Sequence, residues 1–221
     1  MYSEKLSYTE CATETPTAEL TSTRAAESRL KRLMDVSVSL ALFVLLLPGL
    51  LLIVLLIATE SRGSVIFTQT RGGLRGRAFK IYKFRTMRVA EDGPDIKQAT
   101  RNDPRVTRVG LFLRRTSLDE LPQLINVIKG DMSLVGPRPH AISHDIAWSH
   151  QVPHYFRRAF VRPGVTGLAQ ISGCRGEIQC PEDLLRRTDW DIEYANRWSL
   201  ALDMKILAAT CATVFFDKKA F

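Results

Sequence analysis

The feature that most constrains this chain is an uninterrupted apolar segment near its N-terminus. From Val36 to Thr59 the sequence VSVSLALFVLLLPGLLLIVLLIAT contains no charged residue. About 20 apolar residues in a helix suffice to cross the hydrocarbon core of a bilayer. The average of 45% hydrophobic residues over 221 positions hides this segregation. We therefore expect one membrane-embedded element joined to one globular domain of medium size.

The apolar segment carries a helix breaker at its centre. Proline lacks a backbone donor and clashes with the carbonyl four residues earlier, so Pro48, followed by Gly49, predicts a bend near Leu47. A single membrane span usually keeps its excess of Lys and Arg on one side. Here basic residues flank both ends: Arg24, Arg29, Lys31 and Arg32 before the segment, and Arg62, Arg71, Arg75 and Arg77 after it. We predict a re-entrant helix-break-helix over residues 29–60, with a kinked transmembrane helix as the alternative.

Charge and cysteine content describe the surroundings of this segment. The net charge of +8 is local, because residues 29–88 hold 11 basic and two acidic residues, whereas residues 1–28 hold five acidic and two basic ones. The first 28 residues, rich in threonine and glutamate, are typical of a disordered polar tail. The four cysteines match neither a disulfide framework nor a zinc ribbon. We expect reduced thiols and a catalytic face in the cytoplasm.

The segment after the apolar stretch is strongly basic and has a strand pattern. Residues 63–87 read GSVIFTQTRGGLRGRAFKIYKFRTM, in which two alternating β-branched and aromatic runs flank a glycine-rich turn, and this predicts a β-hairpin. Between Arg62 and Arg88 there are eight basic residues and no acid. This surface could lie beside anionic lipid headgroups. It could also form a pocket for phosphates, with Lys83 and Arg85 as candidate ligands.

Helical spacing dominates the rest of the chain. The apolar periodicity of residues 105–139 predicts helix, interrupted by Pro122 and closed at Gly130, a usual stop residue. Residues 183–198 and 199–216 indicate two further helices.

The last of these helices is amphipathic and carries Asp203 and Lys205, so we expect it in the plane of the membrane interface. The predicted fold class is α+β, with a β-hairpin and interfacial helices in a small cytoplasmic domain. Its predicted organisation is a tail of residues 1–28, a membrane-embedded helix of residues 29–60 and a catalytic domain of residues 61–221.

An acidic pair is the strongest candidate for chemistry. In RRTSLDELP, Ser117 followed by Glu120 fits a capping box, which would start a helix at Ser117 with Asp119 in its first turn. The exposed amides of a helix start attract phosphate and favour an ionised Asp119. Such a carboxylate could attack phosphorus. Glu120 and Asp119 could share Mg²⁺, which usually takes one or two carboxylates together with substrate phosphate oxygens.

A second candidate is the arginine of Gly136-Pro137-Arg138-Pro139. The flanking prolines restrict the backbone, which presents the Arg138 guanidinium for bidentate phosphate recognition. With Arg114 close to the acidic pair in sequence, a phosphate clamp is predicted.

Other cofactor signals are weak or missing. His140, His144, His150 and His154 pair at helical spacing that could hold zinc, but Pro153 interrupts the second pair and no glutamate follows as in H-E-x-x-H. The chain contains neither G-x-x-x-x-G-K-S/T nor a G-x-G-x-x-G turn after a strand, so a nucleotide would bind without those phosphate cradles.

Several separate blocks, taken in order, make the sequence recognisable. They are LKRLMD before the proline-broken segment, GSVIFTQTRGGLRGRAFKIYKFRTM, LRRTSLDELPQLINVIKGDMSLVGPRP, RPGVTGLAQISG and NRWSLALDMKIL. From about Arg29 to the C-terminus the chain resembles the bacterial sugar transferase family, the monotopic polyprenol-phosphate phosphoglycosyl transferases that begin membrane-bound glycan assembly. The resemblance implies a small α+β domain on the cytoplasmic leaflet of the bacterial inner membrane, in contact with membrane lipids.

The resemblance also implies a two-step reaction. Asp119 would attack the β-phosphate of a UDP-sugar, expel UMP and carry the sugar phosphate, which undecaprenyl phosphate would then accept. Glu120 would bind Mg²⁺, while Arg114 and Arg138 would handle phosphate. Lys31 and Arg32 match the family's cations at the level of the headgroups, and Pro48 matches its helix-breaking proline. Family members often carry serine before that proline, where this chain has Leu47.

The stretch 174–177, followed by WDIEYANRWSL, is similar to enzymes that use UDP-glucose or UDP-galactose to begin exopolysaccharide synthesis. Two other classes remain open from the residues alone. One is a membrane-anchored basic module that binds nucleic acid or an acidic polymer through residues 62–88. The arginines of this segment follow a hairpin pattern rather than that of a known motif that binds a nucleic-acid groove, so we expect no nucleic-acid partner. The other is a non-catalytic scaffold for polysaccharide export, which would leave the acidic pair without a purpose. The oligomeric state is not legible.

Overall fold

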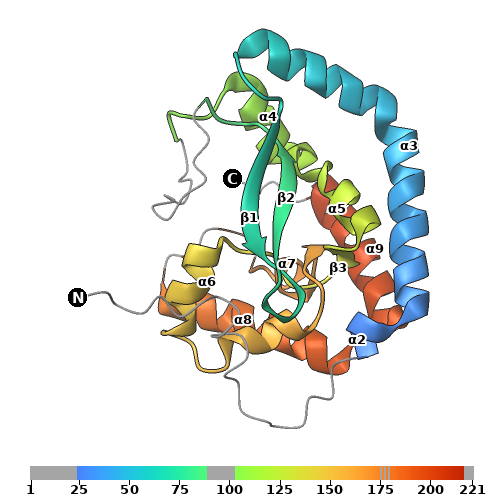
Figure 1. Cartoon of the computed structure of the whole chain (residues 1–221), viewed down its shortest axis with the longest axis vertical. Helices are drawn as coiled ribbons and strands as arrows, with labels where there is room; N and C mark the ends of the chain where they lie inside the picture. Colours follow the sequence, from blue (N-terminus) through green and yellow to red (C-terminus); the bar gives the residue numbers. More distant parts are fainter. Residues whose placement is uncertain (1–23, 89–102, 175, 177, 179, 217–221) are drawn as a thin grey trace.

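The computed structural model describes residues 24–88, 103–174, 176, 178 and 180–216 (Figure 1). Helices and short strands alternate along the described chain, in agreement with the predicted α+β class. The elements are α2 (Arg24–Glu27), α3 (Arg29–Glu60), β1 (Ile66–Gly72), η2 (Leu74–Gly76), β2 (Ala78–Phe84), α4 (Arg108–Thr116), η3 (Leu118–Glu120), α5 (Gln123–Lys129), β3 (Ser133–Val135), α6 (Ile142–Ser149), η4 (Tyr155–Phe160), β4 (Gly164–Thr166), α7 (Leu168–Ile171), α8 (Pro181–Arg197) and α9 (Leu200–Phe216).

The N-terminal tail is shorter than predicted. Residues 24–27 form the helical turn α2, in which Ala25 is buried, so the structured part of the chain begins before residue 29. The first 23 positions of the predicted tail lie outside the described residues.

Helix α3 runs along one side of the molecule and bends in its middle (Figure 1). Pro48 lies inside it, yet the helix is one continuous element from Arg29 to Glu60. The predicted break is therefore a bend, because a proline removes one backbone hydrogen bond while the turns on either side keep theirs. Only 17% of its most apolar 18-residue window is buried, and the helix is long and apolar enough to cross a membrane by length and composition.

The C-terminal half of α3 packs on the globular domain. Leu50, Ile53 and Ile57 form a buried cluster with Phe84 at the end of β2 and Leu113 of α4. Beyond this cluster, the Glu60 carboxylate accepts hydrogen bonds from the first two backbone amides of α4, at 2.8 and 3.0 Å. These amides have no partner within their own helix, so Glu60 caps α4 from outside. The end of α3 is thereby fastened to the domain that follows it.

The N-terminal end of α3 is fastened to the same domain by the two cations that we expected at the lipid headgroups. Lys31 is 4% exposed, and its Nζ donates to an Asp203 carboxylate oxygen (2.7 Å) and to the Val135 carbonyl (3.1 Å). Arg32 donates to the Ile128 carbonyl (2.7 Å) near the end of α5, where helix carbonyls lack partners. Protein oxygens therefore take the place of the predicted lipid contacts of Lys31 and Arg32.

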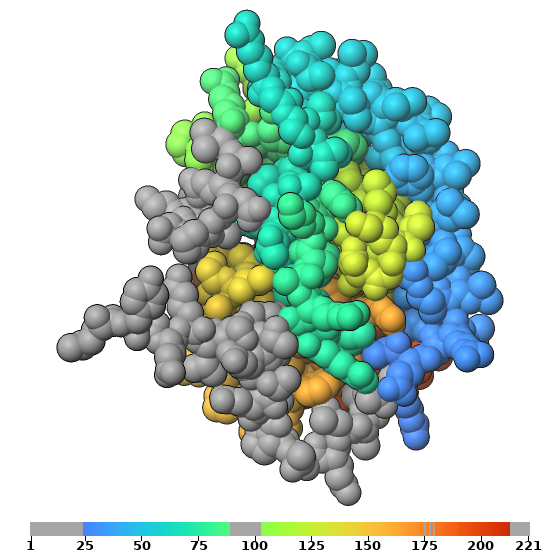
Figure 2. Space-filling model, viewed as in Figure 1, coloured from blue at the N-terminus to red at the C-terminus, as the bar shows by residue number. Residues whose placement is uncertain are grey.

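The predicted hairpin is confirmed. Strands β1 and β2 pair antiparallel from Ile66 opposite Phe84 to Gly72 opposite Ala78, around the turn that contains η2. The predicted stop at Gly130 is also confirmed, since this glycine ends α5 with a φ of 96°, a left-handed conformation that suits glycine. Helix α5 lies between the hairpin and α3 (Figures 1 and 2).

The parallel pair β3 and β4 was not predicted. Ser133 pairs with Gly164 and Val135 with Thr166, although the first stretch has helical spacing and the second reads as irregular. Three residues are too few to show a period of two. Beside this pair lies the main core, which includes Val127, Met132, Leu134, Val135, Tyr194 and Ile206.

Helices α8 and α9 confirm the two predicted C-terminal helices. Asp203 of α9 is fully buried rather than turned toward a polar interface, and it accepts hydrogen bonds from Tyr194 (2.8 Å) and Trp198 (3.0 Å) as well as from Lys31. The acid that seemed to divide α9 into polar and apolar faces is part of the interior.

Candidate active site

The acidic pair lies on η3, a single 3-10 turn between α4 and α5 (Figure 1). The predicted capping box is wrong, because Ser117 ends α4 in a left-handed conformation (φ 56°) and its side chain caps neither helix. A long helix starting at Ser117 would hold Pro122 in its interior, where the proline ring clashes with a carbonyl. The chain instead begins α5 after Pro122 and turns the Glu120 side chain toward two cations.

Glu120 is held by one cation from β2 and one from the segment after β3. Lys83 Nζ donates to Glu120 Oε1 (2.8 Å), and the Arg138 guanidinium donates to both carboxylate oxygens, with Nη1 3.0 Å from Oε2. Burial alone would raise the pKa of Glu120, but the charges of Arg138 and Lys83 hold it well below its ordinary value. Glu120 is therefore ionised and ties three distant parts of the chain together.

The neighbouring Asp119 carboxylate differs from that of Glu120 in its hydrogen bonding and in the direction of its pKa shift. Among the described residues none donates a hydrogen bond to the Asp119 carboxylate or forms an ion pair with it. Burial, and then the negative charge of Glu120, raise its pKa from 3.8 to about 6, although Lys83, Arg138 and Arg114 act in the other direction. At neutral pH the group is ionised, and its lone pairs are not engaged. Such a carboxylate can act as a nucleophile.

Arg114 reaches the site from the last turn of α4, as its position in the sequence suggested. Its Nε donates to the Thr86 hydroxyl (2.9 Å), and the charge of Asp119 acts on its guanidinium. Burial lowers the pKa of Lys83, which is only partly offset by the charge of Glu120. The five residues Asp119, Glu120, Lys83, Arg114 and Arg138 are thus brought together from four separate stretches of structure: η3, β2, α4 and the segment after β3.

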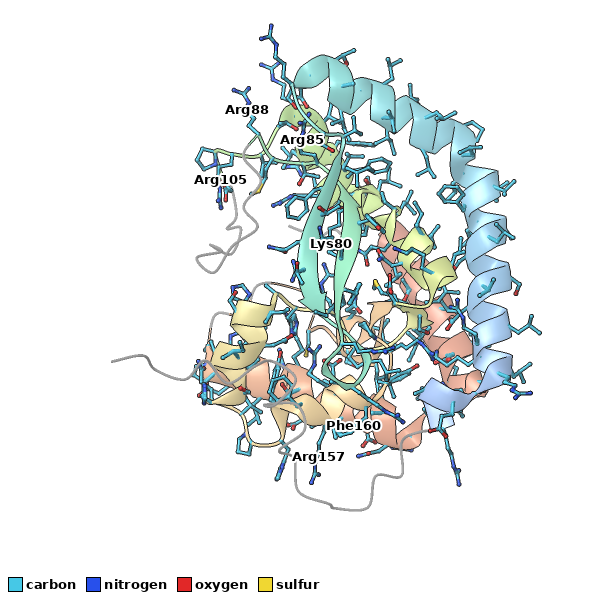
Figure 3. The ribbon with its side chains drawn as sticks, in the orientation of Figure 1. Lys80, Arg85, Arg88, Arg105, Arg157 and Phe160 are labelled. Atoms are coloured by element: carbon cyan, nitrogen blue, oxygen red, sulfur yellow. The ribbon has the colours of Figure 1, made fainter. Side chains whose placement is uncertain are left out.

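Arg85 is not part of this group. It is 7% exposed, and its guanidinium donates to the carbonyls of Ser61 (2.7 Å) and Arg62 (2.8 Å) just after α3. Figure 3 shows Arg85 at the end of the hairpin beside α4, with Lys80 midway along it. The carbonyls at a helix C-terminus lack partners and attract cations, which explains this placement. Arg85 thus joins the hairpin to the end of α3, while its predicted role as a phosphate ligand stays a prediction.

The segment that carries Arg138 is fixed by close backbone packing. The Gly136 amide donates to the Thr166 carbonyl (2.9 Å), and the Gly164 amide donates to the Pro137 carbonyl (2.9 Å). A Cβ added to Gly136 would lie 2.2 Å from the Arg162 carbonyl oxygen, so only glycine fits. Gly136 therefore allows two backbones to approach closely, and this packing fixes the chain just before Arg138.

Asn126 is a residue of the site's framework that the sequence analysis missed. It is fully buried on α5, and its side-chain amide pairs with β2 as a neighbouring strand would: Oδ1 accepts from the Tyr82 amide (3.0 Å) and Nδ2 donates to the Lys80 carbonyl (2.7 Å). Its signal was a polar residue in the apolar run LINVI. Asn126 sets the position of β2 and so of Lys83.

The acidic pair fits Mg²⁺ by its donor set. Both oxygens of Asp119 are available, and Glu120 Oε2 accepts one hydrogen bond from Arg138, which leaves a further lone pair. The described residues contain no group of three or more His, Cys, Asp or Glu that could hold a metal, so Mg²⁺ at the acidic pair would complete its shell with water and substrate oxygens. His140 is buried, with its Nδ1 2.8 Å from the Tyr155 hydroxyl.

Comparison with known proteins shows the family of this chain. The sequence model of the family described as bacterial sugar transferase matches residues 26–217. The chain belongs to this family. The matched residues include η3, Lys83 and Arg138, so the site described above lies within the transferase region.

Individual relatives are similar over most of this chain. A UDP-glucose:undecaprenyl-phosphate glucose-1-phosphate transferase of Caulobacter vibrioides is 50% identical over 198 residues, which cover 90% of this chain and 74% of the relative. An Escherichia coli protein of the same name is 47% identical over 192 residues, but the chain spans only 41% of its length. An exopolysaccharide production protein of Rhizobium leguminosarum is 44% identical, covering 87% of this chain and 98% of the relative.

Proposed function

We propose that this chain transfers a hexose 1-phosphate from a UDP-sugar to undecaprenyl phosphate and so begins the synthesis of an exopolysaccharide. The observation that carries the proposal is Asp119, a carboxylate to which no described residue donates, beside a Glu120 held by two cations. The names of the relatives support the substrates, since two of them use UDP-glucose with undecaprenyl phosphate and one is named for exopolysaccharide production.

In the first proposed step an Asp119 oxygen attacks the β-phosphorus of the UDP-sugar. A bond from Asp119 to phosphorus forms, the bond from that phosphorus to the bridging oxygen breaks, and UMP leaves with the electron pair. The product is a sugar phosphate carried on the Asp119 carboxylate. Arg138, Lys83 and Arg114 lie close enough to act on the charge of Asp119, and they would hold the diphosphate and stabilise the leaving phosphate.

In the second step an oxygen of undecaprenyl phosphate attacks the same phosphorus. The Asp119 oxygen leaves with its electron pair, which restores the carboxylate and releases undecaprenyl diphosphate-sugar. Both nucleophiles are anions, so neither step requires removal of a proton. This agrees with a site whose described residues are two acids surrounded by cations.

Asp119 and Glu120 would hold Mg²⁺ in this reaction. When bound, the metal would neutralise negative charge on the phosphates. Lys83 and Arg138 hold the Glu120 carboxylate in position for it. Removal of Mg²⁺ by a chelator should stop UMP release, and added Mg²⁺ should restore it.

The fastening of α3 supports a re-entrant membrane helix. Lys31 near its start and Glu60 at its end both bind the same globular domain, which supports our proposal that the two ends lie on one side of the bilayer. We infer that this side is the cytoplasmic face of the inner membrane, where UDP-sugars are available. Cysteines introduced at the exposed positions Leu30 and Arg62 should both react with an impermeant reagent from the same face; labelling from opposite faces would establish a full span.

UMP release tests the reaction and its donor together. Purified full-length protein should release UMP from UDP-glucose, or from UDP-galactose, when undecaprenyl phosphate is present. Asp119→Asn should abolish release, whereas Asp189→Asn, the same change at an exposed position of α8, should leave it intact. Release by the Asp119→Asn variant, or no release from any UDP-sugar, would overturn the proposal.

A further inference from the structure

In the segment that carries Arg138, the four successive carbonyls of residues 137–140 are each held by a different partner. Two of its residues are prolines, which lack a backbone donor, so its position depends on these carbonyls. The partners are the Gly164 amide for Pro137 (2.9 Å), the Arg158 guanidinium for Arg138 (2.6 Å), an Arg71 nitrogen for Pro139 (3.4 Å) and the Gly72 amide for His140 (3.4 Å). The shortest of these hydrogen bonds is the one from Arg158 to the carbonyl of Arg138 itself.

Arg158 is a buried arginine whose nitrogens all have protein partners. It is 6% exposed; Nε donates to Asp191 (2.9 Å), Nη2 is paired with the same carboxylate (2.7 Å), and Nη1 lies 3.0 Å from His140 Nδ1. Burial and the charge of Arg158 lower the pKa of His140 well below its ordinary value, so the imidazole stays neutral and can accept this hydrogen bond. Arg158 has therefore no donor to spare for a substrate.

We propose that Arg158 is a positioning residue that holds Arg138 against Glu120 for the reaction, an inference that rests on the proposed function. Its guanidinium joins Asp191 of α8 to the backbone of Arg138, whose side chain then reaches Glu120 on η3. Charge-assisted hydrogen bonds of this kind are short and directional. A displacement of about 1 Å in a group that binds the reacting phosphates can cost a hundredfold in rate.

A rival interpretation is direct contact with the substrate. Arg158 lines a cleft together with Arg138 and the Gly72–Gly73 turn, and a ligand in that cleft would lie beside it. Direct binding predicts a higher KM with kcat unchanged, whereas positioning predicts a lower kcat.

The test compares Arg158→Lys with Arg162→Lys in the full-length protein. Arg162 is a matched control because it also donates to backbone carbonyls, those of Gly130 (3.2 Å) and Ala26 (2.7 Å), without touching Arg138. The readout is steady-state UMP release with undecaprenyl phosphate present, measured over a range of UDP-sugar concentrations, which gives kcat and KM separately. Arg158→Lys should lower kcat by about tenfold to a hundredfold with KM little changed, whereas Arg162→Lys should change neither.

Each other outcome decides against the proposal. Equal kcat values for Arg158→Lys and Arg162→Lys would make Arg158 a structural residue only, and a rise in KM with kcat unchanged would make it a binding residue. If Arg158→Lys does not fold, Asp191→Asn replaces it, because this variant keeps Arg158 but weakens its support. A wild-type kcat in Asp191→Asn would then overturn the inference. A wild-type protein that releases no UMP overturns the proposed function, and this inference with it.

Discussion

The raised pKa of Asp119 makes the first half of the reaction depend on pH in a predictable way. A carboxylate attacks phosphorus only when ionised, so the rate should fall as the pH drops through its pKa of about 6. At pH 5 a group with this pKa is about one-tenth ionised, whereas an aspartate at its ordinary 3.8 would be almost fully ionised. The acid limb of the pH profile, where the rate falls toward low pH, therefore distinguishes the Asp119 of this site from an ordinary surface aspartate.

The assay must exclude other groups that titrate near pH 6. Phosphate monoesters do so, and undecaprenyl phosphate is one of them. UMP release in a single turnover without the lipid acceptor avoids this problem, because both phosphates of a UDP-sugar are diesters. The predicted profile rises with pH and levels off above about pH 7.

Glu120→Gln tests the cause of the shift. The negative charge of Glu120 is the second largest influence raising the pKa of Asp119, and its removal also frees Lys83 and Arg138 to act on Asp119. The acid limb should move to lower pH, whatever happens to the maximal rate. Glu193→Gln, the same change on the surface of α8, should leave the limb in place. A wild-type limb below pH 5, or a limb unmoved in Glu120→Gln, would refute the reasoning.

Three further predictions concern stability. Asp119→Asn should stabilise the fold at pH 7.5 by up to about 3 kcal/mol, because a raised carboxylate pKa penalises the folded state where the group ionises. This gain should vanish below about pH 4, where the carboxyl is protonated in both the folded and the unfolded state. A variant whose Tm equals that of the wild type at both pH values would contradict this. Asn126→Ala should cost about 1–3 kcal/mol by leaving two partly buried backbone groups of β2 without partners, whereas exposed Asn196→Ala should be nearly neutral in thermal unfolding. Gly136→Ala should lower both Tm and UMP release, in contrast to Gly49→Ala, whose Cβ meets nothing within 4 Å.

The parts of the fold that sequence could predict are those with local signals. The hairpin has alternating residues around glycines, Gly130 follows a periodic helix, and α3 has a long apolar run. The pair β3 and β4 has no such signal, because each strand is three residues long and its partner lies about 30 residues away. Pairing at that distance depends on the packed core rather than on either segment.

The site shows the same division. Residue chemistry and the family resemblance predicted Asp119, Glu120 and Arg138, and the structure brings the Arg138 guanidinium into contact with Glu120 beside Asp119. Their catalytic roles stay predictions. The sequence did not predict the protein partners of Lys31 and Arg85, since a cation that binds lipid or phosphate and one that binds protein oxygens look alike in a sequence. What distinguishes them is the position of unpaired carbonyls in the folded chain, which no local pattern contains.

The central claim is that Asp119 carries the sugar phosphate between the two steps. The most direct measurement is mass spectrometry of full-length protein quenched rapidly after mixing with a UDP-sugar and Mg²⁺, without lipid acceptor. The mechanism predicts a mass increase of one hexose phosphate on the peptide that contains Asp119, which disappears when undecaprenyl phosphate is added. UMP release at full rate with no adduct on that peptide would contradict it.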